Sequence, residues 1–89
     1  IIFMNINDLI AIVKKKLINE IKIEKIEVED KSFLHKNHSG HQEGKFHLKL
    51  KINSKELKDL NRIESNKKIY KIIDQEMKEY IHSLQILIN

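Results

Sequence analysis

The sequence contains no cysteine, and this absence removes several kinds of chemistry at once. Disulfides, zinc–thiolate sites and thiol catalysis are all excluded for this chain. A metal ion held by this chain alone must therefore use histidine, aspartate or glutamate as its ligands. The absence of cysteine also leaves the redox compartment undetermined.

Proline is absent as well, and there are only two glycines, Gly40 and Gly44. Because glycine and proline are the strongest local markers of turns, these two glycines indicate one clear loop, at residues 33–44. We find no internal repeat and no linker, and a chain of 89 residues is too short for two ordinary domains. We therefore expect a single domain over residues 1–89, with one modest core.

Long apolar runs are also missing. No run approaches the roughly 18 residues that span a bilayer, so no membrane segment is expected. Ile1–Met4 is too short for the hydrophobic region of a signal peptide. The chain begins with isoleucine, which suggests a fragment or a processed form, and a removed targeting segment would leave no trace. The compartment, cytoplasmic or mitochondrial, stays open.

Arginine is scarce, since Arg62 is the only arginine among 17 basic residues. The formal net charge of +4 suits a nucleic acid or an acidic partner. Surfaces that read bases usually depend on arginine, however. A lysine-rich solvated surface is the simpler interpretation of this charge.

The residues that are present form regular patterns. An amphipathic helix is predicted over Asn5–Ile21, with one apolar stripe made of Ile6, Leu9, Ile10, Val13, Leu17 and Ile21. Alternation of apolar and polar residues predicts strands at Lys25–Asp30 and Phe46–Ile52. The outward side chains are acidic in the first strand and basic in the second, which favours an antiparallel pair with Glu27 and Glu29 across from Lys49 and Lys51.

The second half of the chain is predicted to be helical and then extended. Ser54 is expected to cap a short helix at Lys55–Leu60. A longer helix follows at Ser65–Glu79, with a buried stripe made of Ile69, Tyr70, Ile73, Met77 and Tyr80. Ile81–Ile88 alternates again and is predicted to be a third strand. The order α-β-β-α-α-β predicts an α+β fold, a three-stranded sheet with helices on one face, and the long helical crossover favours a mixed sheet.

Five histidines are the candidates for metal chemistry. His35, His38 and His41 lie in the glycine-flanked loop at spacing i, i+3, i+6, and neutral imidazole is a good ligand for borderline metals. No carboxylate pair or helical HExxH motif accompanies them, so a polar surface loop is the simpler interpretation. His47 is predicted on the outward face of its strand, in a structural or solvated role.

His82 begins the last strand in phase with its apolar face, at the end where this face opens to solvent. A lone histidine in this position is more often half-buried with its hydrogen bonds satisfied than a metal ligand. A functional role for His82 is the alternative.

An enzyme is the weakest interpretation of the sequence. Ser32, Ser54, Ser65 and Ser83 are explained by helix caps or loop ends, and Ser39 lies in the loop. No glycine loop could hold a phosphate. The acidic residues are expected on solvated faces, with no carboxylate pair in apolar surroundings.

Nucleic-acid binding is the second hypothesis. The short helix, the turn at Leu60–Glu64 and the longer helix could form a helix-turn-helix. The residues available to contact phosphates would be Arg62, Asn66, Lys67, Lys68 and Lys71. A helical hairpin that covers a sheet explains the same pattern, and the aromatic pair of an RNA-binding sheet is missing.

Several short sequence elements follow one another along the chain. The first are Ile26–Ser32, a histidine-rich loop and the run Gly44–Leu48, which leads into a strand that ends at Ser54. The later elements are Arg62, Ile69-Tyr70, Glu76-Met77 and Ile81–Leu84. Together, from about Ile10 to Ile88, they resemble the BolA-like family. The D-x-S element with its histidine loop and the I-H-[AS]-L element are the most specific parts of this resemblance.

The resemblance implies a fold similar to a class II KH domain and a protein that is not an enzyme. It implies that a monothiol glutaredoxin is the partner, and that the two proteins share a [2Fe-2S] cluster whose thiolates come from the glutaredoxin and glutathione. This chain would be a monomer alone, without a cluster, and would form a heterodimer in the complex. Imidazole can replace thiolate on one iron of such a cluster.

Position by position, the resemblance makes His82 the expected cluster ligand. His35 or His38 would be the second ligand, while His41 matches less well and His47 matches a histidine of structural type. The family's R-H-R run is altered here, because Arg62 is followed by residues 63–66 without a histidine. Some relatives are linked to transcription, so a DNA-binding regulator remains the alternative.

Overall fold

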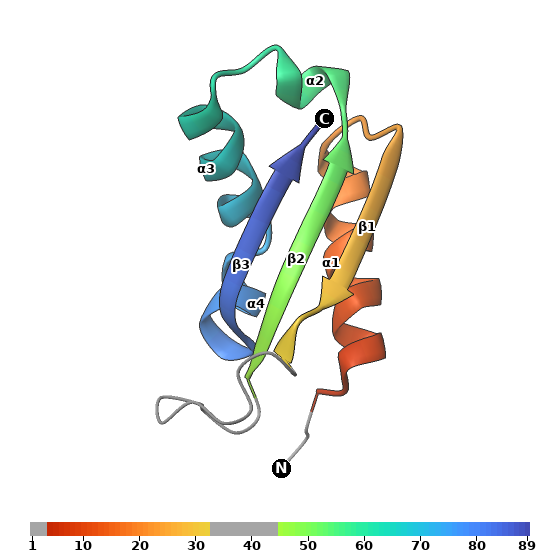
Figure 1. Cartoon of the computed structure of the whole chain (residues 1–89), viewed down its shortest axis with the longest axis vertical. Coiled ribbons are helices and arrows are strands. Elements are labelled where there is room, and N and C mark those ends of the chain that lie inside the picture. The colour runs from red at the N-terminus through yellow and green to blue at the C-terminus, as the bar shows by residue number, and fades with distance from the viewer. Residues whose placement is uncertain (1–3, 33–44) are drawn as a thin grey trace.

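Three strands form one mixed sheet in the order β1-β2-β3. The computed structural model describes residues 4–32 and 45–89 (Figure 1). Along the chain the elements are α1 (Ile6–Glu20), β1 (Lys25–Asp30), β2 (Phe46–Asn53), α2 (Lys55–Lys58), α3 (Arg62–Ile72), α4 (Asp74–Glu79) and β3 (Ile81–Ile88). β1 and β2 are antiparallel, and β2 and β3 are parallel because the helical segment α2–α4 carries the chain back across the sheet. The predicted α+β fold with a mixed sheet is confirmed.

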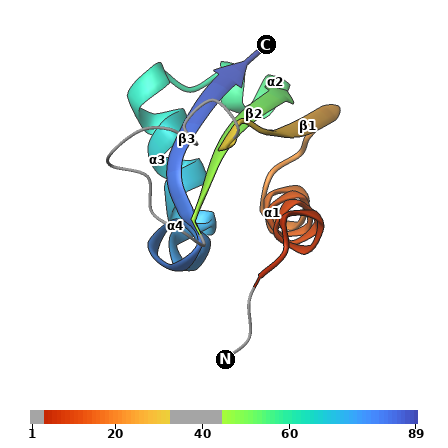
Figure 2. The same ribbon diagram turned by 60° about the horizontal axis from the view of Figure 1, so that its bottom comes forward.

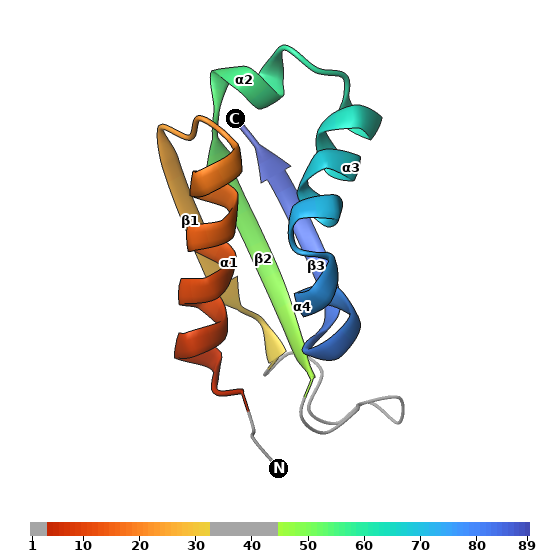
Figure 3. The same ribbon diagram turned by 180° about the vertical axis from the view of Figure 1, so that it is seen from behind.

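The helices α1, α3 and α4 cover one face of this sheet and leave the other face open, as Figures 1 and 3 show from opposite sides. The core lies between them. Its fully buried apolar residues include Leu9, Val13 and Leu17 from α1 and Leu50 and Ile52 from β2. No helix in residues 4–32 and 45–89 is long and apolar enough to cross a membrane.

Side-chain caps fix where the helices begin. Asn5 Oδ1 accepts a hydrogen bond of 2.8 Å from the backbone N–H of Asp8, as expected for the N-cap of α1. Ser54 Oγ accepts from the N–H of Leu57 at 3.2 Å and donates to the carbonyl of Lys22 at 2.8 Å, which ties α2 to the end of α1. The predicted short helix is shorter than expected, since α2 is a single turn.

The predicted helix Ser65–Glu79 differs from the structure at three points. It begins earlier, at Arg62, because the Asn61 side chain caps it through the N–H of Glu64 at 2.8 Å. It is interrupted at Ile73, where α3 ends and α4 begins. The stripe that faces the sheet is Ile69, Ile73 and Glu76, so Tyr70, about 100° around the helix from Ile69, is 39% exposed rather than buried.

The strand pairing places opposite charges together on the open face. Glu27 lies opposite Lys51 and Glu29 lies opposite Lys49, as predicted. Glu29 also contacts Lys31 Nζ at 2.9 Å and Lys51 Nζ at 3.1 Å. Hydrogen bonds from Lys31 and then Lys51 lower the pKa of Glu29 from 4.5 to about 2, and the same contact raises the pKa of Lys51.

This depressed pKa predicts a pH-dependent contribution to stability. A carboxylate whose pKa is lower in the folded state stabilises the fold above its unfolded pKa of 4.5, and this contribution is lost as the pH falls through the folded pKa of about 2. We expect Glu29→Gln to be less stable than the wild type at neutral pH, and this difference to shrink steadily as the pH falls from 4.5 toward about 2. Urea unfolding across this pH range measures the difference. Glu64→Gln, which removes an exposed carboxylate, is the control, and an equal pH trend in both variants would contradict the prediction.

Candidate functional site

A β-bulge lies where β3 begins. Phe46 pairs with Ile81, but the next residue of β2, His47, pairs with Ser83, so one residue of β3 is left over. That extra residue is His82. A bulge bends the strand and re-aims the side chains on either side of it, and bulges are common beside functional sites.

The bulge reverses the predicted direction of the His82 side chain. Simple alternation from Leu84 would point His82 toward the helices, as the sequence pattern indicated. Instead Ile81 fills the core position and is fully buried, whereas His82 is exposed. The His82 ring lies beside the ring of His47, with 4.8 Å between centroids and planes tilted by 60°. His47 alternates with the core residues of β2, so His82 is presented on the open face of the sheet.

His47 is a buried connector of all three strands rather than a solvated side chain. It is only 6% exposed, and its Nδ1 lies 2.6 Å from Ser83 Oγ on β3. Its backbone N–H donates to Ser32 Oγ at 3.1 Å, and its carbonyl accepts from the N–H of Lys31 at 2.7 Å. These contacts join the end of β1 and the start of β3 to β2. His82 therefore stands on a firmly supported part of the sheet.

The histidine loop of the sequence begins and ends at this site. Ser32 precedes it and bonds to His47, and Lys45 follows it, next to Phe46 of β2. Figure 2 brings this end of the sheet forward and shows the start of β2 beside α4. The remaining candidate ligands, His35, His38 and His41, lie outside the residues that the structure describes.

The set of possible metal ligands in the described residues is small. No group of three or more histidine, cysteine or acidic side chains comes together in residues 4–32 and 45–89. The whole sequence supplies no thiolate. His82 is an exposed imidazole, which suits it to contribute a ligand to a metal group whose other ligands come from elsewhere.

A buried ion pair supports the start of β3 from the helical side. Lys16 Nζ on α1 contacts Glu76 Oε2 on α4 at 2.7 Å, and Glu76 is 4% exposed. The carbonyl of Glu76 accepts from the N–H of Tyr80, and the carbonyl of Tyr80 accepts from the N–H of Phe46, both at 2.9 Å. Glu76 thus links α1, α4 and the first pair of the β2–β3 ladder.

The sequence prediction missed Glu76, because it placed the acidic residues on solvated faces. The signal was its spacing, since Glu76 follows Ile69 and Ile73 by seven and three residues on the buried stripe.

Comparison with known proteins identifies the family of this chain. The family model described as BolA-like protein matches residues 17–89. The chain belongs to the BolA-like family. No curated protein sequence matches it significantly.

Solved structures of BolA proteins have the same fold as this BolA-like chain. The BolA domain of SufE1 from Arabidopsis thaliana is 27% identical with a TM-score of 0.77, over 97% of this chain and 93% of that one. BolA1 from Arabidopsis thaliana is 24% identical with a TM-score of 0.76, over 90% and 88%. BolA1 from Mus musculus is 16% identical with a TM-score of 0.71, over 89% and 62%.

The BolA-like chain does not gather its nucleic-acid candidates on one surface. Arg62 and Asn66 line a hollow beside β3, while Lys68 and Lys71 line a hollow of about 570 Å³ between α3 and α1. Lys67 is exposed and lines neither of these hollows.

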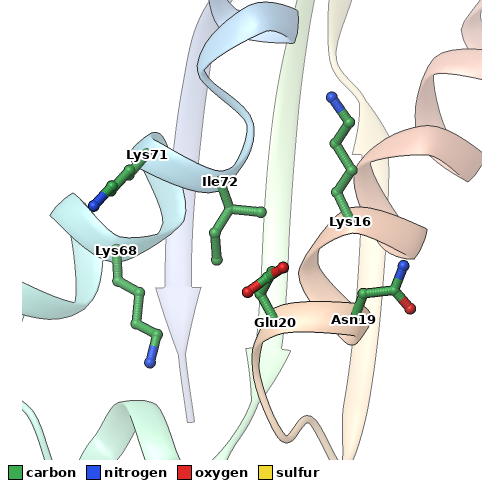
Figure 4. A pocket seen from close by; sticks show the side chains of 6 residues that line it. All are labelled: Lys16, Asn19, Glu20, Lys68, Lys71 and Ile72. Atoms are coloured by element: carbon green, nitrogen blue, oxygen red, sulfur yellow. The ribbon is translucent and has the colours of Figure 1, made fainter.

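The lysines between α1 and α3 do not converge either. In Figure 4 the amino groups of Lys16, Lys68 and Lys71 point in different directions, and Glu20 lies among them. Lys68 Nζ is held by Glu56 Oε2 at 2.9 Å, and this bond, followed by one from the backbone N–H of Lys22, lowers the pKa of Glu56. These residues therefore do not form one helix face that could bind along a phosphate backbone.

Proposed function

We propose that this BolA-like chain is a non-enzymatic adaptor that pairs with a monothiol glutaredoxin and helps to hold a shared [2Fe-2S] cluster, for cluster assembly and trafficking or for iron homeostasis. The observation that carries the proposal is the bulge that presents His82, an exposed imidazole, on the open face of the sheet. A ligand in this position is accessible to a partner surface.

The ligand chemistry supports a shared cluster over one held by this chain alone. A [2Fe-2S] cluster needs four ligands, usually thiolates, with histidine as a known replacement on one iron. The chain has no cysteine, so glutaredoxin and glutathione would supply the thiolates. His82 would supply one imidazole, and His35 or His38 would supply the other, because their segment starts and ends beside His47.

The other residues of the site would orient the ligand. The 2.6 Å contact between His47 and Ser83 fastens the strand directly after the bulge, and the His47 ring flanks that of His82. Metal ligands usually depend on such supporting contacts, because these fix the direction of the ring. The proposed role of His47 is therefore to hold His82 in place.

Reconstitution tests this function directly. The chain would be mixed without oxygen with a monothiol glutaredoxin, glutathione, iron and sulfide, and visible absorption and circular dichroism would be recorded. We expect a one-to-one complex whose spectrum differs from that of the glutaredoxin's own cluster, and no cluster on this chain alone. A glutaredoxin spectrum unchanged by addition of the chain would overturn the proposal.

The nucleic-acid alternative receives no comparable support. Two of its five candidate residues line the hollow beside β3, two line the hollow beside α1, and Lys67 lines neither. Lys68 is also already paired with Glu56. The adaptor is therefore the function that the geometry favours.

A further inference from the structure

The two outer strands of the sheet differ in charge. β1 has the sequence KIEVED, with four charged residues, whereas β3 has the sequence IHSLQILI, with no lysine, arginine, aspartate or glutamate. Natural sheets protect their exposed edges with charge, proline or bulges. The bulge of β3 involves only its first residues, so the part from Leu84 to Ile88 has none of these protections.

The backbone of β3 offers unused hydrogen-bonding groups along its outer edge. The N–H of Asn89 donates to Ile52 at 2.8 Å, and its carbonyl accepts from Ser54 at 3.2 Å, so both groups of Asn89 face β2. Because successive residues of a strand alternate, the N–H and C=O groups of Leu84, Ile86 and Ile88 face away from β2. Within the described residues the sheet ends at β3, so these groups form an open ladder.

A groove runs beside this edge, between β3 and α3, which lies along its outer side (Figures 1 and 3). Two hollows of about 470 and 270 Å³ form the groove, and both are lined by Arg62, Asn66, Ile86 and Leu87. Leu87 is 38% exposed although it is a large apolar residue. The groove has room for an extended chain alongside the open ladder.

The charge of the groove is of one sign. Lys58 and Arg62 are the charged residues that line it, and no acidic residue does. The ion pairs of the described residues include neither of them. An acidic side chain placed here would gain a cationic partner that the fold itself leaves unused.

We propose that the β3 edge binds an extended, acidic segment of a partner protein, which adds a further strand beside β3 and places a carboxylate against Arg62. Main-chain hydrogen bonds to Leu84, Ile86 and Ile88 would supply affinity, and Arg62 would supply selectivity, as in other cases of strand addition. This surface is separate from His82, and the inference does not depend on the proposed cluster.

Two other occupants fit less well. If β3 of a second copy paired with β3, two cationic grooves would face each other without an acidic partner. The α3 helices of both copies would also lie beside the shared β3–β3 contact. A single-stranded nucleic acid lacks the regular alternation of donors and acceptors of a peptide backbone. Lys68 and Lys71, which could hold phosphates, line the hollow on the α1 side of α3 instead.

The probe for this site is a labelled peptide as long as β3, with valine and glutamate in alternation. Its glutamates can face α3 while its valines cover Leu87. Fluorescence anisotropy would measure affinity, and amide hydrogen exchange would locate the strand. We expect the peptide to slow exchange at the outward N–H groups of Leu84, Ile86 and Ile88. The outward N–H groups of Ile26 and Val28, on the charged edge, should be unaffected.

Matched variants separate strand addition from simple charge attraction. Arg62→Glu should weaken binding about tenfold or more, as expected for loss of a charge-assisted hydrogen bond. Lys67→Glu makes the same change of charge on the same helix but away from the groove, and should change affinity by less than about threefold. Methylation of alternate backbone nitrogens of the probe peptide removes the N–H donors along one of its edges. Binding should be abolished when these donors face β3 and should persist when they lie on the opposite edge.

The outcomes divide clearly. Protection confined to Leu84, Ile86 and Ile88, with a selective loss in Arg62→Glu, establishes the site. Protection at Ile26 and Val28, equal effects of Arg62→Glu and Lys67→Glu, or equal binding of the two methylated peptides would overturn it. Tighter binding of an oligothymidine with the same protection would assign the groove to nucleic acid, and concentration-dependent protection without any ligand would assign it to a second copy.

Discussion

Replacement of His82 by alanine is expected to remove the spectrum that distinguishes the mixed glutaredoxin complex from the glutaredoxin's own cluster. His82 is the exposed imidazole on the open face at the bulge, and no second histidine of the described residues is equally accessible. Loss of a residue that only supports a metal ligand costs roughly 10–100-fold in metal affinity, and loss of the ligand itself should cost at least as much. Titration of the chain into cluster-loaded glutaredoxin, followed by circular dichroism, measures this loss.

Two further variants make this result specific to the ligand. His82→Cys returns a donor to the same position, and should restore a mixed cluster with a shifted spectrum and a lower reduction potential, because thiolate ligation lowers the potential relative to histidine. Gln85→Ala changes another exposed residue of β3 and should leave the spectrum unchanged. If His82→Ala forms the same mixed complex as the wild type, His82 is not a ligand.

The regular elements could be predicted because local signals agree with the tertiary fold. The strand at Ile81–Ile88 was predicted with its correct bounds, and the caps at Asn5 and Ser54 began helices where expected. The charge pattern of Glu27 and Glu29 against Lys49 and Lys51 also predicted the antiparallel pairing of β1 and β2. In each case the spacing of side chains determines both the local structure and the face that is buried.

The geometry of the site could not be obtained from the same signals. Ile81–Ile88 alternates equally well with or without a bulge, so its residues do not reveal that Ile81 takes the core position and His82 turns to the open face. The bulge arises where α4 delivers the chain to β2, which is a tertiary constraint. His47 likewise follows an outward alternation but is buried by contacts with residues distant in sequence.

Glu76 is the clearest example of a tertiary effect that overrides composition. Acidic residues are almost never fully buried unless they are paired, so the sequence alone predicts that a glutamate is exposed to solvent. Here Lys16 comes from α1, 60 residues away in sequence, and makes burial possible. No local pattern identifies that partner.

This pair predicts the largest effect on stability. Lys16→Met should lower the free energy of unfolding by about 2–3 kcal/mol, because it leaves the buried Glu76 carboxylate without its cation. This loss is smaller than the roughly 3–5 kcal/mol known for fully buried pairs, since the Lys16 side chain is 38% exposed and the site is partly solvated. A domain of this size has roughly 5–10 kcal/mol in total, so urea unfolding will resolve the change. Lys78→Met, which removes the exposed pair with Asp74, should cost less than about 0.5 kcal/mol.

A double variant separates loss of the pair from loss of one partner. Glu76 Oε1 is buried without a hydrogen-bond partner among the described residues, so the wild-type pair already carries an unfavourable group. Lys16→Met combined with Glu76→Leu removes both charges and this oxygen, and should return stability to within about 1 kcal/mol of the wild type. If the double variant is instead as far below the wild type in stability as Lys16→Met alone, the pair itself stabilises the fold. Glu76 would then hold α4, and with it the start of β3, by attraction to Lys16 rather than by its place in the buried stripe.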